Sequence, residues 1–179
     1  FSYVIGNPPF MSVKRSSLDF AEAYDEVIYG HPNLYVLFLW WSVKASQQDG
    51  IISLLLPQSI LIGNYFQRIR QALNETTTLL DITRMIDRKG VVGDADQQMM
   101  TLCLKVGQDG EHSHITLRAT RNGMDIKQAT FTLEPKEKVI RKFGSTIFWV
   151  VSENALDYEI EEILRSASTN IGELDSDFQ

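Results

Sequence analysis

Four consecutive residues, Asn7, Pro8, Pro9 and Phe10, have the side chains and backbone best suited to chemistry in this sequence. The two prolines fix their φ angles and lack N–H groups, so the turn is rigid and its carbonyl oxygens face no competing donors from these residues. The amide oxygen of Asn7 is one more acceptor, and it avoids the cost of burying an unpaired carboxylate charge. The segment therefore predicts a site that accepts hydrogen bonds from a planar group.

The exocyclic amino group of a nucleobase fits these acceptors. Its nitrogen is a poor nucleophile because its lone pair is delocalised into the ring. When the Asn7 amide oxygen and a proline carbonyl hold its two N–H bonds, the nitrogen can become tetrahedral and attack a methyl donor, so positioning and hydrogen bonding carry the catalysis. Phe10 is expected to stack on a base flipped out of the duplex. The alternative is an ordinary proline-rich loop without chemistry.

The apolar run before the motif predicts how the motif is positioned. Residues 1–5 combine β-branched and aromatic side chains, which favours a buried strand, and Gly6 ends it. Asn7 is therefore expected at the carboxyl end of a strand, where open α/β sheets bind their ligands. A polar segment then runs to Pro32 and is long enough to border a substrate groove.

Helices and strands alternate after this segment. Asn33 is expected to cap an apolar helix that ends near Gln48, with Trp40 and Trp41 in the core.

An apolar strand is predicted at 51–56, ended by Pro57. The helix that follows, at 63–74, is expected to expose Arg68 and Gln71. Its predicted buried stripe consists of Ile62, Phe66, Ile69 and Leu73.

The rest of the chain is richer in strands. Strands are predicted at 79–86, 99–106 and 146–151, and at 114–120 and 126–133 in a hairpin closed by Asn-Gly. A short helix or loop is expected at 134–143 and an amphipathic helix at 153–166. The fold class is therefore α/β with a β-rich extension.

The motif and several later segments resemble the N6-adenine-specific DNA methyltransferases of restriction-modification systems. In that family Asn-Pro-Pro-Tyr/Phe follows a hydrophobic strand, as it does here over residues 4–10. Further similar segments lie at 33–38, 50–57, 68–73, 98–104 and 171–174. The likeness covers most of the chain, although only the Asn-Pro-Pro-Phe element is specific by itself.

This resemblance implies a partial S-adenosylmethionine-dependent methyltransferase sheet of the Rossmann-like kind, closed by a late antiparallel hairpin. The activity would be methyl transfer from S-adenosylmethionine to the N6 amino group of adenine in DNA, with Asn7, Pro8, Pro9 and Phe10 as catalytic residues. In the family, the glycine-rich loop and acidic residue that bind S-adenosylmethionine precede the motif. The main cofactor site is therefore expected before residue 1, with Asn7 as a partial contact, and the chain is expected to be a fragment that is inactive alone.

DNA is the partner that the resemblance implies. Lys14 and Arg15 closely follow the motif and are expected to touch phosphates, with ordinary loop solubility as the alternative. Many relatives carry a second stacking aromatic residue before the late strand, but Val91, Val92 and Gly93 stand there in this sequence. The second stacking residue is therefore left open.

Three parts are expected along the chain. Residues 1–107 form the second half of a catalytic domain, 108–165 an α+β extension packed on it, and 166–179 a linker to a target-recognition domain. Two alternatives stay open: a glutamine or RNA amino-group methyltransferase, since such enzymes also use Asn-Pro-Pro-Tyr/Phe, and a degenerate binding module without catalysis. The extension favours DNA as the substrate.

Length and composition favour one globular unit, since 44% of the 179 residues are hydrophobic. The expected location is cytoplasmic. The longest apolar run, 34–41, is too short to span a bilayer. Cys103 is the single cysteine and is expected in the core of a protein from a reducing compartment. His112 and His114 are expected to share a strand face without a third ligand, so no metal site is predicted. The net charge of −6 predicts that most DNA affinity resides outside this chain.

Overall fold

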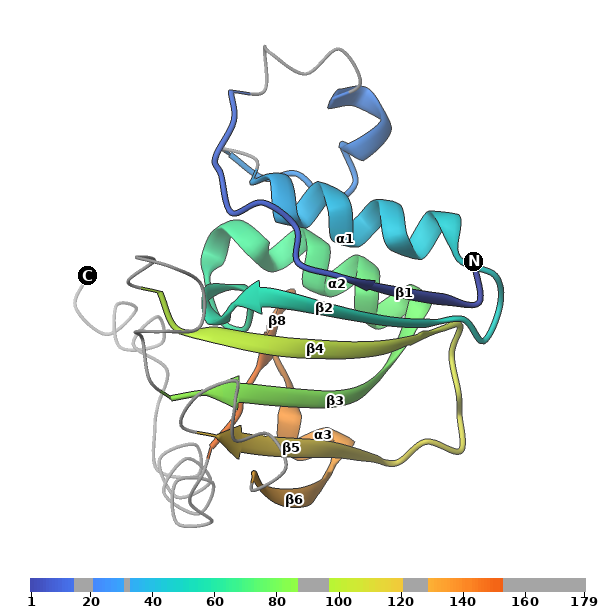
Figure 1. The fold of residues 1–179 in the computed structure, drawn as a ribbon, viewed down its shortest axis with the longest axis vertical. Coiled ribbons are helices and arrows are strands. Elements are labelled where there is room, and N and C mark those ends of the chain that lie inside the picture. The colour runs from blue at the N-terminus through green and yellow to red at the C-terminus, as the bar shows by residue number, and fades with distance from the viewer. Residues whose placement is uncertain (15–20, 31–32, 87–96, 121–128, 153–179) are drawn as a thin grey trace, which may run out of the picture.

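The computed structural model describes residues 1–14, 21–30, 33–86, 97–120 and 129–152 (Figure 1). In chain order the elements are β1 (Tyr3–Gly6), η2 (Ala21–Tyr24), α1 (Leu34–Ala45), β2 (Ile51–Pro57), η3 (Gln58–Ile60), η4 (Asn64–Phe66), α2 (Gln67–Thr76), β3 (Thr77–Met85), β4 (Met99–Val106), β5 (His114–Thr120), β6 (Thr130–Pro135), α3 (Lys136–Val139), β7 (Ile140–Phe143) and β8 (Thr146–Trp149). The η elements are single 3-10 turns.

A six-stranded sheet in the order β1-β2-β4-β3-β5-β6 forms the centre of the described structure (Figure 1). β1 and β2 pair in parallel, as do β3 and β5. β4 is antiparallel to both β2 and β3, so β1, β2, β3 and β5 all run in one direction. The β3–β4 hairpin inserts its second strand into the sheet. This arrangement confirms the α/β class with a late antiparallel hairpin.

Helix α1 begins where the sequence predicts. The Asn33 side chain accepts a hydrogen bond from the Tyr35 N–H at 3.4 Å, which satisfies one of the unpaired donors of the first turn. The helix ends at Ala45, before the expected boundary. Trp40 is buried as predicted, but Trp41 is 47% exposed, so its expected core position is wrong. Neighbouring residues on a helix point in different directions, and only one side of α1 meets the sheet.

Helix α2 is amphipathic, with Ile69 and Leu73 buried and Arg68 and Gln71 exposed, as predicted. The helix starts after the η4 turn, later than expected. Ile62 precedes both elements and is 61% exposed, so its expected place in the buried stripe is wrong. Helical spacing does not apply to a residue outside the helix.

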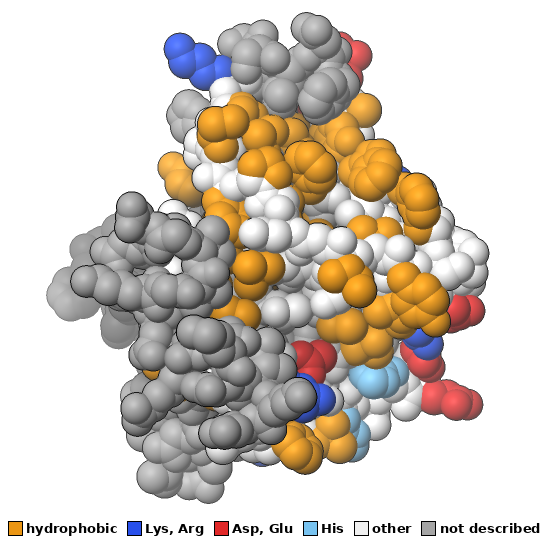
Figure 2. Space-filling view, in the orientation of Figure 1, with side chains coloured by type: hydrophobic (Ala, Val, Ile, Leu, Met, Phe, Trp, Pro, Cys, Tyr) orange, Lys and Arg blue, Asp and Glu red, His pale blue; other side chains and the backbone are white. Residues whose placement is uncertain are grey.

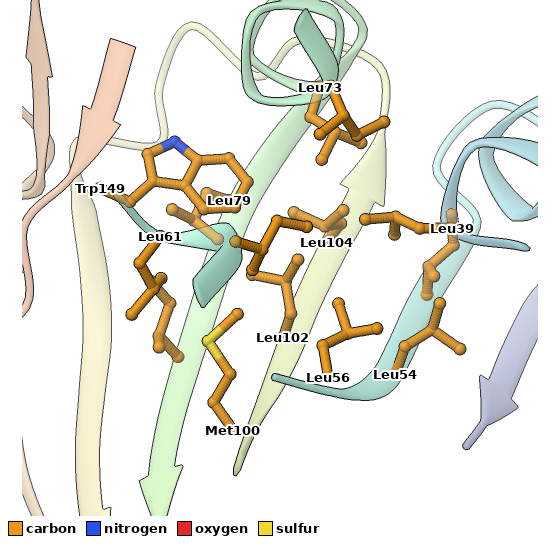
Figure 3. Packing of buried hydrophobic residues seen from close by; sticks show 14 of the residues in the cluster. Leu39, Leu54, Leu56, Leu61, Leu73, Leu79, Met100, Leu102, Leu104 and Trp149 are labelled. Carbon is orange, nitrogen blue, oxygen red and sulfur yellow. The ribbon is translucent and has the colours of Figure 1, made fainter. Parts of the chain in front are cut away.

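The core lies between the sheet and these helices. Alternate residues of β2 and β4 are buried and pack with Leu39 of α1, Leu73 of α2 and Trp149 of β8 (Figure 3). Burial of one leucine side chain contributes about 1.5–3 kcal/mol, so this shared cluster holds the helices and the β7–β8 hairpin against the sheet. The buried strand residues are Ile52, Leu54, Leu56, Met100, Leu102 and Leu104.

The opposite face of the sheet carries no helix from the part of the chain that the structure describes (Figure 1). Figure 2 shows apolar side chains on this face. Ile5 is 85% exposed there and Cys103 is half-buried. The expectations of a buried strand at 1–5 and of a core position for Cys103 are therefore wrong, because both require a layer over this face. Strand pairing places six residues in one row across it: Ile5, Ser53, Cys103, Asp81, Thr116 and Leu133.

The chain beyond β4 adds strands to the sheet. β5 and β6 form the expected hairpin, although β6 begins at Thr130 and the Asn-Gly tip lies outside the described residues. Residues 134–143 are not one helix or loop: the short α3 leads into β7, which pairs with β8 in a second hairpin. The strand at 146–149 was predicted, but its partner was not. The expected helix at 153–166 and the linker at 166–179 lie outside the described residues.

Candidate active site

The Asn-Pro-Pro-Phe segment directly follows β1 at the edge of the sheet. Gly6 pairs with Leu54 of β2, and a Cβ at Gly6 would lie only 3.3 Å from the Leu54 side chain. Because β1 and β2 are parallel, their carboxyl ends share one edge, the position where such sheets bind ligands. Asn7 is exposed at this edge and Pro8 is buried. The turn is thus anchored while the Asn7 amide is accessible.

Phe10 is half-buried and belongs to an aromatic cluster with residues of α1 and η4. Its ring centroid lies 6.2 Å from that of Tyr35, with the planes at 73° in an edge arrangement. The Tyr35 ring in turn packs against Phe66, with 5.6 Å between the ring centroids. Edge-to-face pairs contribute about 0.5–1.5 kcal/mol beyond simple burial, so the cluster restricts how the Phe10 ring can turn.

Tyr35 supports Phe10 from inside the core. It is 1% exposed, and burial raises the pKa of its phenol to about 12, opposed in part by its hydrogen bond with Ser59. The two hydroxyl oxygens are 3.4 Å apart. Tyr35 therefore stays neutral at physiological pH and acts in packing and hydrogen bonding. Neither residue was singled out from the sequence, because nothing local links 35 to 59.

Gln58 follows β2 at the same edge and joins three strands. Its Nε2 donates to the carbonyl oxygens of Met85 at 3.1 Å and Met99 at 2.9 Å, and its Oε1 accepts from Arg84 Nε at 3.1 Å. Its main-chain N–H donates to the carbonyl oxygen of Gln98 at 2.8 Å. The sequence did place Gln58 directly after a strand, which is the signal that could have identified it.

The segment after Phe10 runs to the start of α1, where the Leu34 N–H donates to the Met11 carbonyl at 2.9 Å. Lys14 is exposed on this segment, close in sequence to the motif. Arg15, the second predicted phosphate contact, lies outside the described residues. Residues 91–93, where the second stacking residue was sought, lie outside them as well.

The two histidines do not share a strand face, because β5 begins at His114 and His112 precedes it, so that expectation is wrong. The described residues contain no group of three or more His, Cys, Asp or Glu side chains that could hold a metal ion. No helix within the described ranges is long and apolar enough to cross a membrane.

A protein-family model, the Eco57I restriction-modification methylase, matches residues 1–91. The match covers just over half of the 179 residues and includes the Asn-Pro-Pro-Phe segment with the elements from β1 to β3. The chain belongs to the Eco57I restriction-modification methylase family. Among curated proteins, no sequence matches it. Membership in this methylase family agrees with the predicted restriction-modification class.

Solved structures share the fold of this methylase chain at low sequence identity. A protein described as a modification subunit of a type I restriction enzyme from Vibrio vulnificus has a TM-score of 0.61 and 15% identity over 90% of this chain and 39% of its own. The type IIG restriction endonuclease BpuSI has a TM-score of 0.59 and 19% identity over 76% of this chain and 19% of its own.

A third similar structure is described as a class I S-adenosylmethionine-dependent methyltransferase from Listeria monocytogenes. Its TM-score is 0.54 and its identity 15%, over 67% of this chain and 36% of its own. The chain thus spans well under half the length of each of these three proteins. At such identities the likeness establishes the methyltransferase fold.

Proposed function

We propose that this chain is the target-holding part of a DNA methyltransferase that modifies the N6 amino group of adenine in a restriction-modification system. The observation that carries the proposal is the Asn-Pro-Pro-Phe turn at the carboxyl edge of β1, within the residues that the methylase family model matches. The accessible Asn7 amide and the anchored Pro8 supply acceptors without a charge. An adenine amino group offers the two N–H donors that such acceptors need.

The residues of this chain act on the amino group in the following roles. Asn7 Oδ1 and a carbonyl of Pro8 or Pro9 accept its two N–H bonds, and these bonds strengthen as the nitrogen becomes tetrahedral. Phe10 stacks on the extruded adenine, and its contact with Tyr35 holds the ring in place. Once the nitrogen is methylated, its surplus proton leaves to water on the exposed side of Asn7.

S-adenosylmethionine supplies the methyl group when it is bound. The chain fits this cofactor in part: the oxygen acceptors of the turn suit a cationic sulfonium, whereas residues 1–14 contain no carboxylate for ribose hydroxyls. We place the main cofactor contacts outside this chain, with Asn7 as a partial contact.

DNA binding rests on few cations in this part of the enzyme. Lys14 is exposed and close in sequence to the motif, and we propose that Lys14 and Arg15 contact phosphates. The net charge of −6 argues against tight DNA binding by this chain alone. Most phosphate contacts, and the recognition of the target sequence, are therefore assigned to other regions of a cytoplasmic enzyme, reached through residues 166–179.

The test is Asn7→Ala in the methyltransferase that contains this chain, measured by tritiated methyl transfer to unmethylated DNA. Loss of a preorganised acceptor is expected to lower the rate on the order of a hundredfold, with DNA affinity changed far less because phosphate contacts dominate it. Asn74→Ala is the matched control, since Asn74 lies at the end of α2, just before β3 begins and so near the opposite edge. Near-normal transfer by Asn7→Ala, or transfer to RNA or protein glutamine instead of DNA, would refute the proposal.

A further inference from the structure

We propose that Gln58 is a positioning residue for methyl transfer. It holds the strand ends beside the Asn7–Phe10 site in a fixed position relative to the Phe10 ring. This inference rests on the proposed function of that site. It concerns a different residue, which directly follows β2. Its side chain reaches the last residue of β3 and the first residue of β4.

The Gln58 amide uses three of its four hydrogen-bonding positions. Its two N–H donors bind the carbonyls of Met85 and Met99, and its oxygen accepts from Arg84. Met85 is the last residue of β3 and Met99 the first of β4. One planar group therefore binds the last residue of β3 and the first residue of β4 at the same time. Carbonyl oxygens repel each other, and a shared N–H donor group is what allows both to point at one position.

The strand directions place this clamp at the reaction edge. β1, β2 and β3 run in the same direction, so their carboxyl ends meet at one edge of the sheet. Asn7 follows β1 there, Gln58 follows β2, and Met85 ends β3. A base held at Asn7 thus lies at the same edge of the sheet as the strand ends that Gln58 clamps.

The residue next to Gln58 connects the clamp to Phe10. Ser59 is in the same 3-10 turn, and its hydroxyl lies 3.4 Å from that of Tyr35. The Tyr35 ring meets Phe10 edge-on. The η3 turn therefore has one end tied to the β3 and β4 ends, and its middle is tied to Tyr35, whose ring contacts Phe10. If the amide is removed, the turn can shift relative to both, and a displacement of about 1 Å can cost on the order of a hundredfold in rate.

A second glutamine allows a role in positioning to be separated from a role in stability. Gln108 Nε2 also donates to two main-chain carbonyls, those of Asn74 at 2.9 Å and Thr77 at 2.7 Å. Thr77 begins β3, so Gln108 makes the same kind of clamp at the opposite edge of the sheet. Both side chains tie strand ends, but only that of Gln58 lies at the Asn7 edge.

The experiment compares Gln58→Leu with Gln108→Leu in the full methyltransferase that contains this chain. Steady-state methylation of unmethylated DNA gives kcat and KM, and a melting curve is recorded for each variant. We expect Gln58→Leu to lower kcat about tenfold or more with KM for DNA within about threefold, because geometry changes and phosphate contacts do not. Gln108→Leu is expected to keep kcat within about twofold at a comparable melting temperature.

The outcomes separate the two proposals. If the wild-type enzyme is active and the Gln58→Leu and Gln108→Leu variants have equal kcat, the positioning role is rejected. The proposed function then still stands. A wild-type enzyme that transfers no methyl group to adenine rejects both. If Gln58→Leu melts well below Gln108→Leu, Gln58→Met takes its place, since its flexible unbranched chain fills similar space without hydrogen bonds. Wild-type kcat in a stably folded Gln58→Met would also overturn the inference.

Discussion

Among the cations that the structure describes, Arg70 is the one whose removal should destabilise the fold most. It lies on α2 with no exposed surface. Its Nε donates to the Ile147 carbonyl at 2.6 Å, and its Nη1 donates to the carbonyls of Ile60 and Gly63, both at 2.8 Å. One guanidinium therefore ties α2 to the β7–β8 hairpin and to the turns after β2. The perturbation is Arg70→Met, which keeps the length of the stem and removes the donors.

The expected loss follows from two opposing quantities. A hydrogen bond from a charged donor contributes about 1.5–3 kcal/mol, so three of them contribute roughly 4–9 kcal/mol. Burial lowers the pKa of Arg70 to about 10, which corresponds to roughly 3 kcal/mol of lost solvation for the charged form. We therefore expect Arg70→Met to lower the free energy of unfolding by about 3 kcal/mol, within a range of roughly 1–6 kcal/mol.

The sign of the pH dependence sets the assay conditions. The folded pKa of Arg70 lies below the unfolded one, so the penalty on its charge is fully present below about pH 10 and is relieved as pH rises above about 10. At pH 7–8 both states are protonated and titration does not enter. Urea unfolding of the purified chain can be followed there by tryptophan fluorescence, since Trp40 and Trp149 are both buried in the folded state.

Arg68 provides the matched control on the same helix. Its Nη1 also donates to two main-chain carbonyls, those of Asp25 at 3.1 Å and Ile28 at 3.0 Å, but its side chain is exposed. Water replaces those bonds, so Arg68→Met should change the free energy of unfolding by only about 0.5 kcal/mol. If Arg70→Met and Arg68→Met lose the same stability, the assigned role of the buried guanidinium is wrong.

Three further predictions concern the proposed enzyme. In the full enzyme, Phe10→Ala should slow methylation through loss of stacking that contributes about 1–3 kcal/mol, while Phe10→Tyr should keep most activity; equal damage from both would argue against stacking. The isolated chain should bind S-adenosylmethionine weakly or not at all by calorimetry, and micromolar affinity would contradict a main cofactor site elsewhere. Residues 108–165 should tumble with residues 1–107 in NMR relaxation, because β5 pairs with β3, and independent tumbling of the two parts would reject their packing.

Local sequence patterns predicted the elements whose determinants are themselves local. The Asn33 cap, the strand β4 from Met99 to Val106 and the position of Asn7 after a strand all follow from residues adjacent in the chain. An N-cap needs one polar side chain next to the first helical turn. A buried strand can be recognised as a short apolar run bounded by polar or turn-forming residues. The chemistry of the Asn-Pro-Pro-Phe turn was predicted for the same reason.

Exposure was harder to predict wherever it depends on a second layer. Ile5 of β1 and Cys103 have the pattern of core residues, yet they lie on the sheet face that no described helix covers. Trp41 has nearly the same sequence neighbours as Trp40, but Trp41 is exposed and Trp40 is buried. The sequence shows which side chains are apolar, whereas tertiary packing determines whether each of them is covered.

Neighbours along the chain are enough to predict the Asn-Pro-Pro-Phe segment, the strand before it and most helices and strands. Which polar residues serve the fold from a distance depends on how those elements pack in space. Arg68 and Arg70 are two residues apart and chemically identical, but only Arg70 is enclosed by carbonyls of residues 60, 63 and 147. Gln58 acquires its partners in the same way, because hydrogen bonds to main-chain carbonyls depend on where the strands end in space and leave no trace in the identity of the partner residues.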